Sequence, residues 1–217
     1  MSLATLNGHA VLNLHLHMPL RGPWHASVYV DSPNAITGKA VLAIHGMEFH
    51  GHVRRGGVEA ETGAFHIVGG SGGFAKSATS KSYKNAPVRI VLQDILRAAG
   101  ETLSSKANAN TTATILGNWA ILQHACGKCL FQLAEAQGAS WRILPDGTTW
   151  FGIEGWPVRQ GASITQWTDY ARGKKQVWPR APTVLPGDSY EGMRIGAVHY
   201  ALEEASDLQA QLWEAHV

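Results

Sequence analysis

The feature that most constrains the fold is an alternation of apolar and polar residues through the first 70 residues. In residues 8–18, leucines occupy one face and an asparagine and two histidines the other, which is the pattern of a half-buried strand. Segments of strand character follow at 24–31, 38–57 and 63–70, separated by short turn signals. The segment 38–57 is long enough for one strand or two abutting ones. These lengths and connections predict a β meander, the pattern of a small barrel or sandwich.

At Pro87 the period changes from that of a strand to that of a helix. Pro87 suits the first turn of a helix and Gly100 its C-terminal end. Between them, apolar residues fall on one helical face: Val88, Val91, Leu92, Ile95, Leu96 and Ala99. Residues 104–114 are small and polar, and we expect a loop or linker there. A second helix is expected from about Trp119 to Ala136, and its inward face is predicted to hold Ile121, Leu122, Ala125, Cys126, Cys129, Leu130 and Leu133.

Strand character returns after residue 138. Two short apolar segments flank Pro145-Asp146-Gly147, which indicates a hairpin because Asp-Gly tolerates the positive φ that tight turns need. A weak strand signal follows at "SITQW", and residues 193–204 and 208–216 predict a final hairpin. The expected fold class is therefore mainly β (α+β), with two helices inserted in the middle.

Length and charge bound the organisation of the chain. Its 217 residues, 45% of them hydrophobic, suffice for one large domain or two small ones. We divide it into a first β-barrel subdomain at 1–86, a helical insertion at 87–138 and a second β subdomain at 139–217. The formal net charge is only +2, so composition gives no case for nucleic-acid binding. The N-terminus does not resemble a signal peptide and no apolar run approaches a membrane span, so we expect synthesis in the cytoplasm and no membrane insertion.

Cys126 and Cys129 form a C-x-x-C pair, which can be a redox dithiol or half of a zinc site. A structural zinc site needs a second pair of ligands at suitable spacing, and the sequence offers none of the zinc-finger type. The simpler interpretation is two small apolar residues one turn apart on a helix.

The stretch Gly69-Gly70-Ser71-Gly72-Gly73 fits G-x-S-x-G, the nucleophile elbow of serine hydrolases, and also looks like a phosphate-binding loop. An elbow needs a helix directly after the serine, and the polar residues that follow lack an apolar stripe. A phosphate loop needs glycine immediately before lysine, and Ala75 precedes Lys76. Both interpretations are therefore weak. A hydrolase around Ser71 stays as an alternative function.

The eleven histidines suggest a metal site. His15 and His17 share one strand face by the period of two. Another strand face carries Glu48, His50, His52 and Arg54. Two adjacent H-x-H strands could supply nitrogen and oxygen ligands to zinc or iron. The competing interpretation is a polar strand face turned to solvent or to a lumen, and the sequence does not say which strands are neighbours.

Three tryptophans, Trp141, Trp150 and Trp156, surround the Asp146-Gly147 hairpin. Trp141 and Trp150 are placed to meet across it. A platform for stacking a sugar or base is one interpretation, and aromatic pairing that stabilises a small β unit is the better one.

The order of these segments resembles the baseplate hub proteins of contractile-tailed bacteriophages and related injection machines, the hub and late-control-protein superfamily. The resemblance runs from about residue 40 to 204. It is carried by the paired glycines Gly69-Gly70 and Gly72-Gly73 before the Tyr83 segment, by "VLQDILRAAGE", and by "WRILPDGTTWFG". None of these pieces is an enzymatic signature.

The resemblance implies a structural role. Hub proteins of this kind use tail-tube-like split β-barrel domains. Three copies form a ring of approximate sixfold symmetry that adapts the hexameric tail tube to a trimeric central spike, and its channel passes the tape-measure protein and then DNA. The implied partners are two further copies, the tail tube protein, the central spike protein and other baseplate subunits. The implied location is the tail baseplate of a virion, with the host cytoplasm during assembly.

Under this interpretation no catalytic residue, cofactor or metal is expected. Glu48, His50, His52 and Arg54 are expected to face the channel, with Met47, Phe49 and Val53 in the barrel core. Two alternatives remain open: another tube-to-baseplate adaptor of a phage or injection machine, and a small hydrolase or metal-dependent enzyme that uses Ser71 or the histidine-rich strands.

Overall fold

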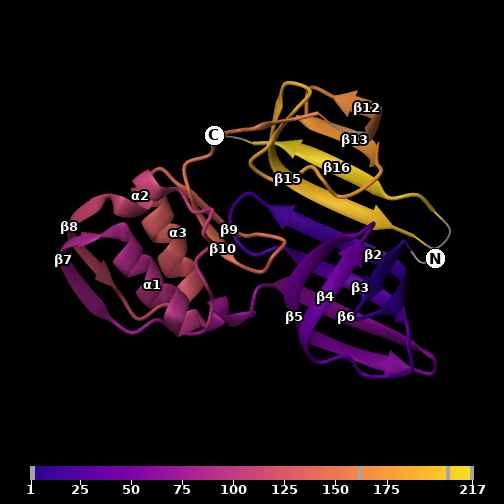
Figure 1. The fold of residues 1–217 in the computed structure, drawn as a ribbon, viewed down its shortest axis with the longest axis horizontal. Coiled ribbons are helices and arrows are strands. Elements are labelled where there is room, and N and C mark those ends of the chain that lie inside the picture. The colour runs from indigo at the N-terminus through magenta and orange to yellow at the C-terminus, as the bar shows by residue number, and fades with distance from the viewer. Residues whose placement is uncertain (1–2, 161–162, 204–205, 216–217) are drawn as a thin grey trace.

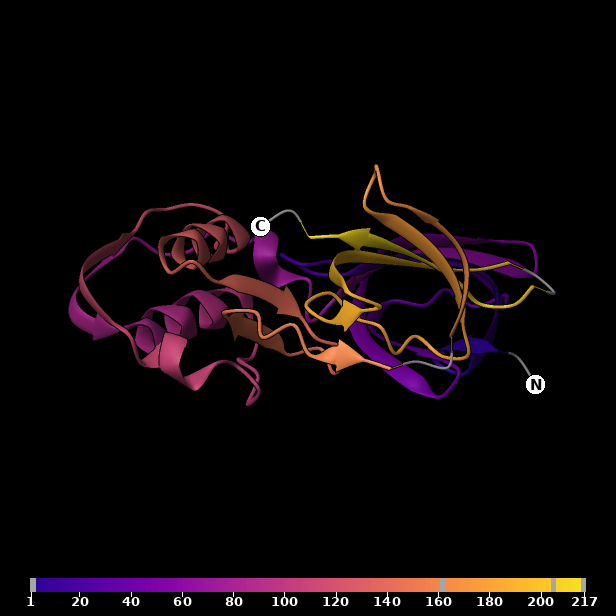
Figure 2. The ribbon, with the colours of Figure 1, turned by 90° about the horizontal axis from the view of Figure 1, so that it is seen from above.

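A computed structural model describes residues 3–160, 163–203 and 206–215. The described chain is mainly β, with three α-helices gathered at one end (Figure 1). This confirms the mainly β (α+β) class. Figure 2 shows the unit that contains the three helices at one end of the molecule and most of the β-strands at the other, with the hairpin of residues 140–152 between them.

The first six strands close into a barrel in the order β1-β4-β5-β6-β3-β2, because β1 also pairs with β2. Their bounds are β1 Ala4–Leu6, β2 His9–Pro19, β3 His25–Asp31, β4 Gly38–Ile44, β5 Met47–Glu59 and β6 Thr62–Gly69. A plain meander is therefore wrong at one connection. The chain leaves β3, which lies beside β6, and crosses to β1 before it starts β4. This crossing lets β1 close the barrel and cover a sheet edge that a meander would leave free.

The alternation that predicts the strands is confirmed in the barrel core. On β3, Ala26, Val28 and Val30 are buried, while the residues between them are exposed. The segment 38–57 forms two strands, split by a tight turn in which His45 and Gly46 have φ of 47° and 81°. Two consecutive positive φ values give the turn a twist that matches the flanking strands.

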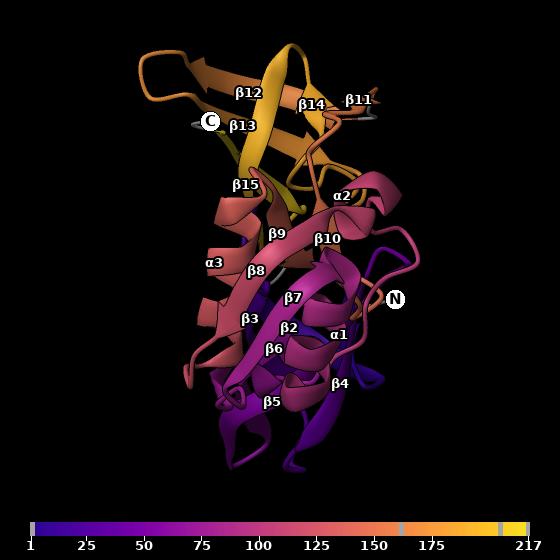
Figure 3. The same ribbon diagram turned by 90° about the vertical axis from the view of Figure 1, so that its left-hand side faces the viewer.

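The helical unit contains the remaining sequence up to residue 136. Its elements are the 3-10 turn η1 Gly73–Ala75, β7 Lys81–Pro87, α1 Val88–Ala99, α2 Ala109–Ala113, β8 Ile115–Ile121 and α3 Cys126–Ala136. Helix α1 is confirmed: its whole predicted apolar face is buried, and Gly100 ends it in the left-handed conformation. In Figure 3 the ribbon of β7 and β8 lies in front of α1 and α3.

Two expectations for this unit are wrong. The segment 104–114 is not only a loop, because Asn108 accepts a hydrogen bond from the Thr111 N–H and so caps the short helix α2. The second long helix begins at Cys126 rather than near Trp119. Residues 115–121 instead form β8, which pairs with β7 thirty or so residues earlier, and Leu122 is exposed instead of inward. A distant strand partner overrides local helical spacing here.

The predicted hairpin is formed by β9 Ser140–Ile143 and β10 Thr149–Gly152. The expectation that Trp141 and Trp150 meet across it is wrong. The register pairs Trp141 with Phe151 and Trp150 with Arg142, so the two indoles lie on opposite faces. Trp141 is buried against Phe74, with ring centroids 5.0 Å apart. Trp150 stacks under the Arg142 guanidinium, 4.2 Å from its ring centroid.

The C-terminal part forms β11 Val158–Arg159, β12 Ser163–Asp169, β13 Lys174–Pro179, β14 Ser189–Tyr190, β15 Met193–Leu202 and β16 Gln209–Glu214. The final hairpin, β15–β16, is confirmed, and the weak signal at "SITQW" corresponds to β12. Strand β15 also pairs with residues 14–19 of β2. The C-terminal strands therefore extend the sheet that begins in the barrel.

Candidate interaction surface

One sheet runs without a break from the barrel into the C-terminal part. Its order is β5-β6-β3-β2-β15-β16-β13-β12, and each neighbouring pair is antiparallel. One side of this eight-stranded sheet packs on the core through residues such as Leu16, Val28, Val198 and Leu212. In the described part of the chain no further layer covers the other side, where polar side chains such as those of His15 and His25 are exposed, since residues alternate between the two sides of a strand.

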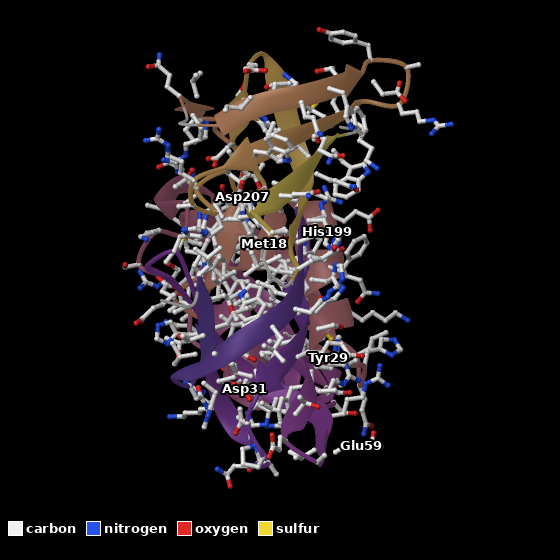
Figure 4. The ribbon with its side chains drawn as sticks, turned by 90° about the vertical axis from the view of Figure 1, so that its right-hand side faces the viewer. Met18, Tyr29, Asp31, Glu59, His199 and Asp207 are labelled. Carbon is white, nitrogen blue, oxygen red and sulfur yellow. The ribbon has the colours of Figure 1, made fainter. Side chains whose placement is uncertain are left out.

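Histidines gather on this uncovered side. We call the surface formed by five of them, His15, His17, His25, His66 and His199, the histidine face. They come from β2, β3, β6 and β15. In the register, His17 lies directly opposite His25 on one side and His199 on the other. In Figure 4, His199 and Tyr29 lie to the same side of the buried Met18.

The five rings are close to one another. His15 stacks on His199 with ring centroids 5.3 Å apart. His25 lies 5.0 Å from His17 and 5.9 Å from His66. Trp213 on β16 closes the group, with its ring 6.4 Å from His17 and 6.5 Å from His199. The result is a continuous band of rings across five neighbouring strands.

Partial burial and neighbouring charges make four of these histidines, His17, His25, His66 and His199, hard to protonate. Desolvation lowers the pKa of His17, His25, His66 and His199. Neighbouring imidazoles lower the pKa of His17, His66 and His199 further. These four imidazoles are therefore largely uncharged at neutral pH.

Permanent cations border the face on two sides. Arg54 and Arg55 on β5 lower the pKa of His66, and Lys174 on β13 lowers that of His199. The Lys174 ammonium lies over two indoles, 5.2 Å from the Trp213 centroid and 5.7 Å from that of Trp167. The band of rings is thus flanked by basic side chains at both ends.

The eight-stranded sheet has two unpaired edges in the part of the chain that the structure describes. Strand β5 pairs with β4 only as far as Val53, whereas β6 accompanies it to Glu59, so residues 54–59 have a strand on one side only. At the other end, β12 pairs only with β13. Strand β12 exposes Ile164 and Trp167, with exposed fractions of 70% and 38%. An exposed apolar edge strand is a template for pairing with another chain.

The structure separates the side chains expected to face a channel into two pairs. Glu48 and His50 lie near the β9–β10 hairpin, where the His50 N–H donates to the Pro145 carbonyl over 2.7 Å. His52 is paired in register with Val68, in the row that leads to His25, and Arg54 lies near His66. On β5, Phe49 is buried, while Glu48, His50 and Arg54 are exposed on the outside of the barrel.

A groove of about 560 Å³ lies beside Glu48 and His50, between β5, the hairpin and the segments before β11 and β14. Its floor holds an ion pair between Arg142 and Glu154, whose side chains are only 12% and 8% exposed. Burial raises the pKa of Glu154, and the Arg142 guanidinium opposes that shift. The ion pair ties the hairpin to the segment that leads into the C-terminal strands.

The glycine-rich loop binds an anion that belongs to the chain itself. The Glu101 carboxylate accepts hydrogen bonds from the Ser71 N–H at 3.0 Å, from the Ser71 hydroxyl at 2.7 Å and from the Gly73 N–H at 3.3 Å. A side chain at Gly70 or Gly73 would clash with Glu101 or with the Ala99 carbonyl. Glycines therefore let the loop wrap a carboxylate, in the way that other glycine-rich loops wrap phosphate.

Neither enzymatic alternative gains support from this geometry. The Ser71 hydroxyl donates a hydrogen bond to the Glu101 carboxylate. The residues after Ser71 form a short 3-10 turn and then a strand, where a nucleophile elbow needs a helix. The two H-x-H strands, β2 and β5, are not adjacent, because β3 and β6 lie between them. Within the described ranges no group of three or more His, Cys, Asp or Glu side chains is arranged to hold a metal ion.

Cys126 and Cys129 are free, buried and one turn apart on α3, as the simpler interpretation of the C-x-x-C pair predicts. Burial raises the pKa of both thiols. A raised thiol pKa disfavours the thiolate, so neither cysteine has the character of a reactive site.

Sequence reasoning singled out His15 and His17 but missed the partners that complete the histidine face. His25, His66 and His199 each occupy a polar position in a segment correctly identified as a strand. The signal was present in the alternation of each strand. The pairing of β2 with β3 and β15, which brings the histidines together, was not.

Comparison with known proteins bears on the fold. No protein-family model matches the sequence, and no curated protein matches it. Among solved structures, the chain is similar to the 43 kDa tail protein of prophage MuSo2 from Shewanella oneidensis, with a TM-score of 0.71 and 10% identity over 97% of this chain and 95% of that one. It is similar to a tail protein of Neisseria meningitidis, with a TM-score of 0.68 and 12% identity over 97% and 95% of the two chains.

A third similar structure is an Escherichia coli component of the type VI secretion system, described as structurally similar to the T4 bacteriophage tail proteins gp27 and gp5. The TM-score is 0.66, with 11% identity over 98% of this chain and 76% of that one. At these identities the likeness is one of fold. It confirms the resemblance to phage tail proteins as a likeness of fold, over nearly the whole chain.

Proposed function

We propose that this protein is a structural subunit of a phage tail baseplate, and that three copies form a hub ring around a channel. The ring adapts a hexameric tail tube to a trimeric central spike. The fold shared with phage tail and secretion-system proteins supports a structural role in a tail. The observation that carries the ring is the eight-stranded sheet with an unpaired edge at each end.

The polarity of the sheet suits closure by identical copies. Because eight strands alternate in direction, β12 of one copy would run antiparallel to β5 of the next. A head-to-tail contact of this kind is heterologous, since one surface meets a different surface of the neighbour, and repeated around an axis it closes a ring. Each new copy then covers the edge that the previous one leaves open.

The chain already uses the same arrangement once within itself. The first residues of β2 pair with β1, and residues 14–19, which extend beyond β1, pair with β15 on that side. Strand β5 is built alike: residues 47–53 pair with β4, and residues 54–59 extend beyond it. On β2 the extension is filled by a strand of the same chain. We infer that on β5 it is filled by β12 of a neighbouring copy.

In such a ring the uncovered side of the sheet faces the lumen, because the other side holds the core. The lumen would be lined by the histidine face, and Glu48, His50, His52 and Arg54 continue the polar side of β5 beside it. The lining would be polar and rich in rings, and permanent cations would stand only at its borders. We propose that the tape-measure protein and then DNA pass along this surface.

The test is the mass of the purified chain in solution, by analytical ultracentrifugation or native mass spectrometry. The proposal predicts a trimer, or trimers that form as concentration rises. Ile164→Lys should shift the chain to monomer, because a lysine on an exposed edge disfavours strand pairing. Leu122→Lys is the matched control: Leu122 is 60% exposed in the helical unit, away from both edges, and its variant should assemble normally.

A wild-type chain that stays monomeric at all concentrations, or an Ile164→Lys variant that assembles like the control, would contradict the ring. The proposed partners are the tail tube protein, the central spike protein and other baseplate subunits, and the proposed location is the virion tail, after assembly in the host cytoplasm. Among the described residues no helix is long and apolar enough to cross a membrane. A tube-to-baseplate adaptor with the same ring would differ in its neighbours, which binding to purified tube and spike proteins distinguishes.

A further inference from the structure

The histidine face brings many imidazole rings into contact, and this holds whether or not the face lines a channel. Five imidazoles lie close together on one side of a sheet: the centroids of His15 and His199 are 5.3 Å apart, those along the His17, His25 and His66 row are 5.0 and 5.9 Å apart, and the Trp213 ring contacts both groups. The neighbouring groups that perturb them electrostatically are other imidazoles or permanent cations. Such a surface gains charge of a single sign when the pH falls.

We propose that the histidine face is an acid-gated binding surface for a phosphodiester polyanion, and that duplex DNA binds it in acid and slides off it at neutral pH. The proposal deepens the proposed function and rests on it only for the reason why DNA meets this face. The binding chemistry belongs to the face itself.

The charges around the face favour an anion. Its own strands supply His15, His17, His25, His66 and His199. The neighbouring strand β5 supplies Arg54, Arg55 and His52, and β13 supplies Lys174. The acidic side chains Asp31, Asp169, Glu59 and Glu214 stand at strand ends, and the Glu48 carboxylate on β5 lies 3.2 Å from the His50 ring nitrogen. Asp169 is opposite Lys174 in the register, and its carboxylate lies 3.7 Å from the Arg172 guanidinium.

The close spacing of the rings explains why protonation of the face should depend on whether DNA is bound. Protonating one imidazole raises the cost of protonating the next, because the two like charges would lie about 5 Å apart. A phosphate oxygen placed over two rings removes that repulsion and accepts a hydrogen bond from each protonated nitrogen. Protonation and DNA binding therefore stabilise one another, and each should shift the equilibrium of the other.

The first test is fluorescence anisotropy of a labelled duplex oligonucleotide, titrated with the full chain at about pH 5.5 and about pH 8. We expect binding at least about tenfold tighter in acid. Each imidazolium that contacts a phosphate should also add about 0.9 to the slope of log affinity against log salt, so the slope should be steeper in acid. Binding that is equal at the two pH values, or absent at both, would overturn the proposal.

Variants locate the surface. His17→Gln with His199→Gln removes the two central rings and keeps hydrogen-bonding side chains of similar size, and it should abolish most of the acid-dependent gain. The matched control is His45→Gln with His124→Gln, which removes two histidines outside the face and should leave the gain intact. If the control loses the gain as well, acid-dependent binding reflects overall charge, and the proposal fails.

A second measurement needs no variant. In proton NMR titrations of the wild-type chain, the oligonucleotide should raise the pKa of His17, His25, His66 and His199 and leave the ring-proton signals of His45 and His124 unchanged. Equal shifts at all histidines, or no shift, would contradict the proposal even if a variant failed to fold.

The outcomes also separate this inference from the proposed ring. A trimer that shows no acid-dependent DNA binding would contradict this inference but would still support the proposed ring. A monomer that binds DNA in acid through His17 and His199 would support the inference and count against the ring.

Discussion

At the scale of single residues, the most informative position is Glu101, which the sequence analysis did not single out. The glycine-rich stretch could be recognised from the sequence as a loop suited to an anion, but its ligand could not, because Glu101 lies 30 residues away from Ser71. The bond between them depends on α1 ending at Gly100 and on the loop leaving β6 beside that end. Local sequence patterns predict the glycine-rich loop and the end of α1, but they do not predict that Ser71 and Glu101 come into contact.

Replacing Glu101 by alanine should lower the free energy of unfolding by about 1–3 kcal/mol, because the buried Gly73 N–H and the partly buried Ser71 N–H would lose their acceptor. Ser71→Ala should cost about 1 kcal/mol, since one hydroxyl bond is lost and the carboxylate keeps its backbone donors. Urea denaturation followed by circular dichroism measures both. A larger loss for Ser71→Ala than for Glu101→Ala would contradict this account.

At the scale of elements, prediction succeeded where one strand or helix carries its own pattern. Helix α1 was located with its buried face because an apolar stripe, Pro87 and Gly100 lie within fourteen residues. It failed where a partner decides: β8 looked like the start of a helix until β7 paired with it, and the crossing from β3 to β4 depends on β1. The histidine face belongs to the second kind, since its residues were visible and their juxtaposition was not.

Helix α1 offers a test with an internal control. Ile95→Ala should lower the free energy of unfolding by about 2–5 kcal/mol, because Ile95 is fully buried between α1 and its neighbours and a cavity would remain. Ile90→Ala removes the same atoms from the same helix at a position that is 43% exposed, and it should cost well under about 1 kcal/mol. Similar costs for the two variants would mean that the helix packs by another face.

At the scale of the whole molecule, the sheet joins segments from both ends of the chain into one surface whose charge depends on pH. The pKa values of His17, His25, His66 and His199 are lowered in the folded chain, so the unfolded chain binds more protons once the pH falls below about 6.5. Stability is therefore complete above that pH and decreases as the pH falls toward the lowered pKa values.

Thermal denaturation between about pH 8 and pH 5 should thus show a melting temperature that is flat above about pH 7 and falls below about 6.5. The His17→Gln, His199→Gln double variant should flatten the acid part of this curve, while His45→Gln with His124→Gln should not. The carboxylates Asp94 and Glu191 have lowered pKa values and act in a separate, more acidic range. A curve that the double variant leaves unchanged would place the acid sensitivity elsewhere.

The pairing of β2 with β15 has a consequence for how the chain is made. The two strands are separated by more than 170 residues, so a growing chain can complete the six strands of its barrel long before β15 leaves the ribosome. Until then, residues 14–19 of β2 and residues 54–59 of β5 each lack a strand partner on one side. Two nascent chains on one messenger RNA can pair through these segments. Synthesis rate and the spacing of ribosomes should therefore influence how much chain reaches its correct partner, and how much is captured by a neighbour still being translated.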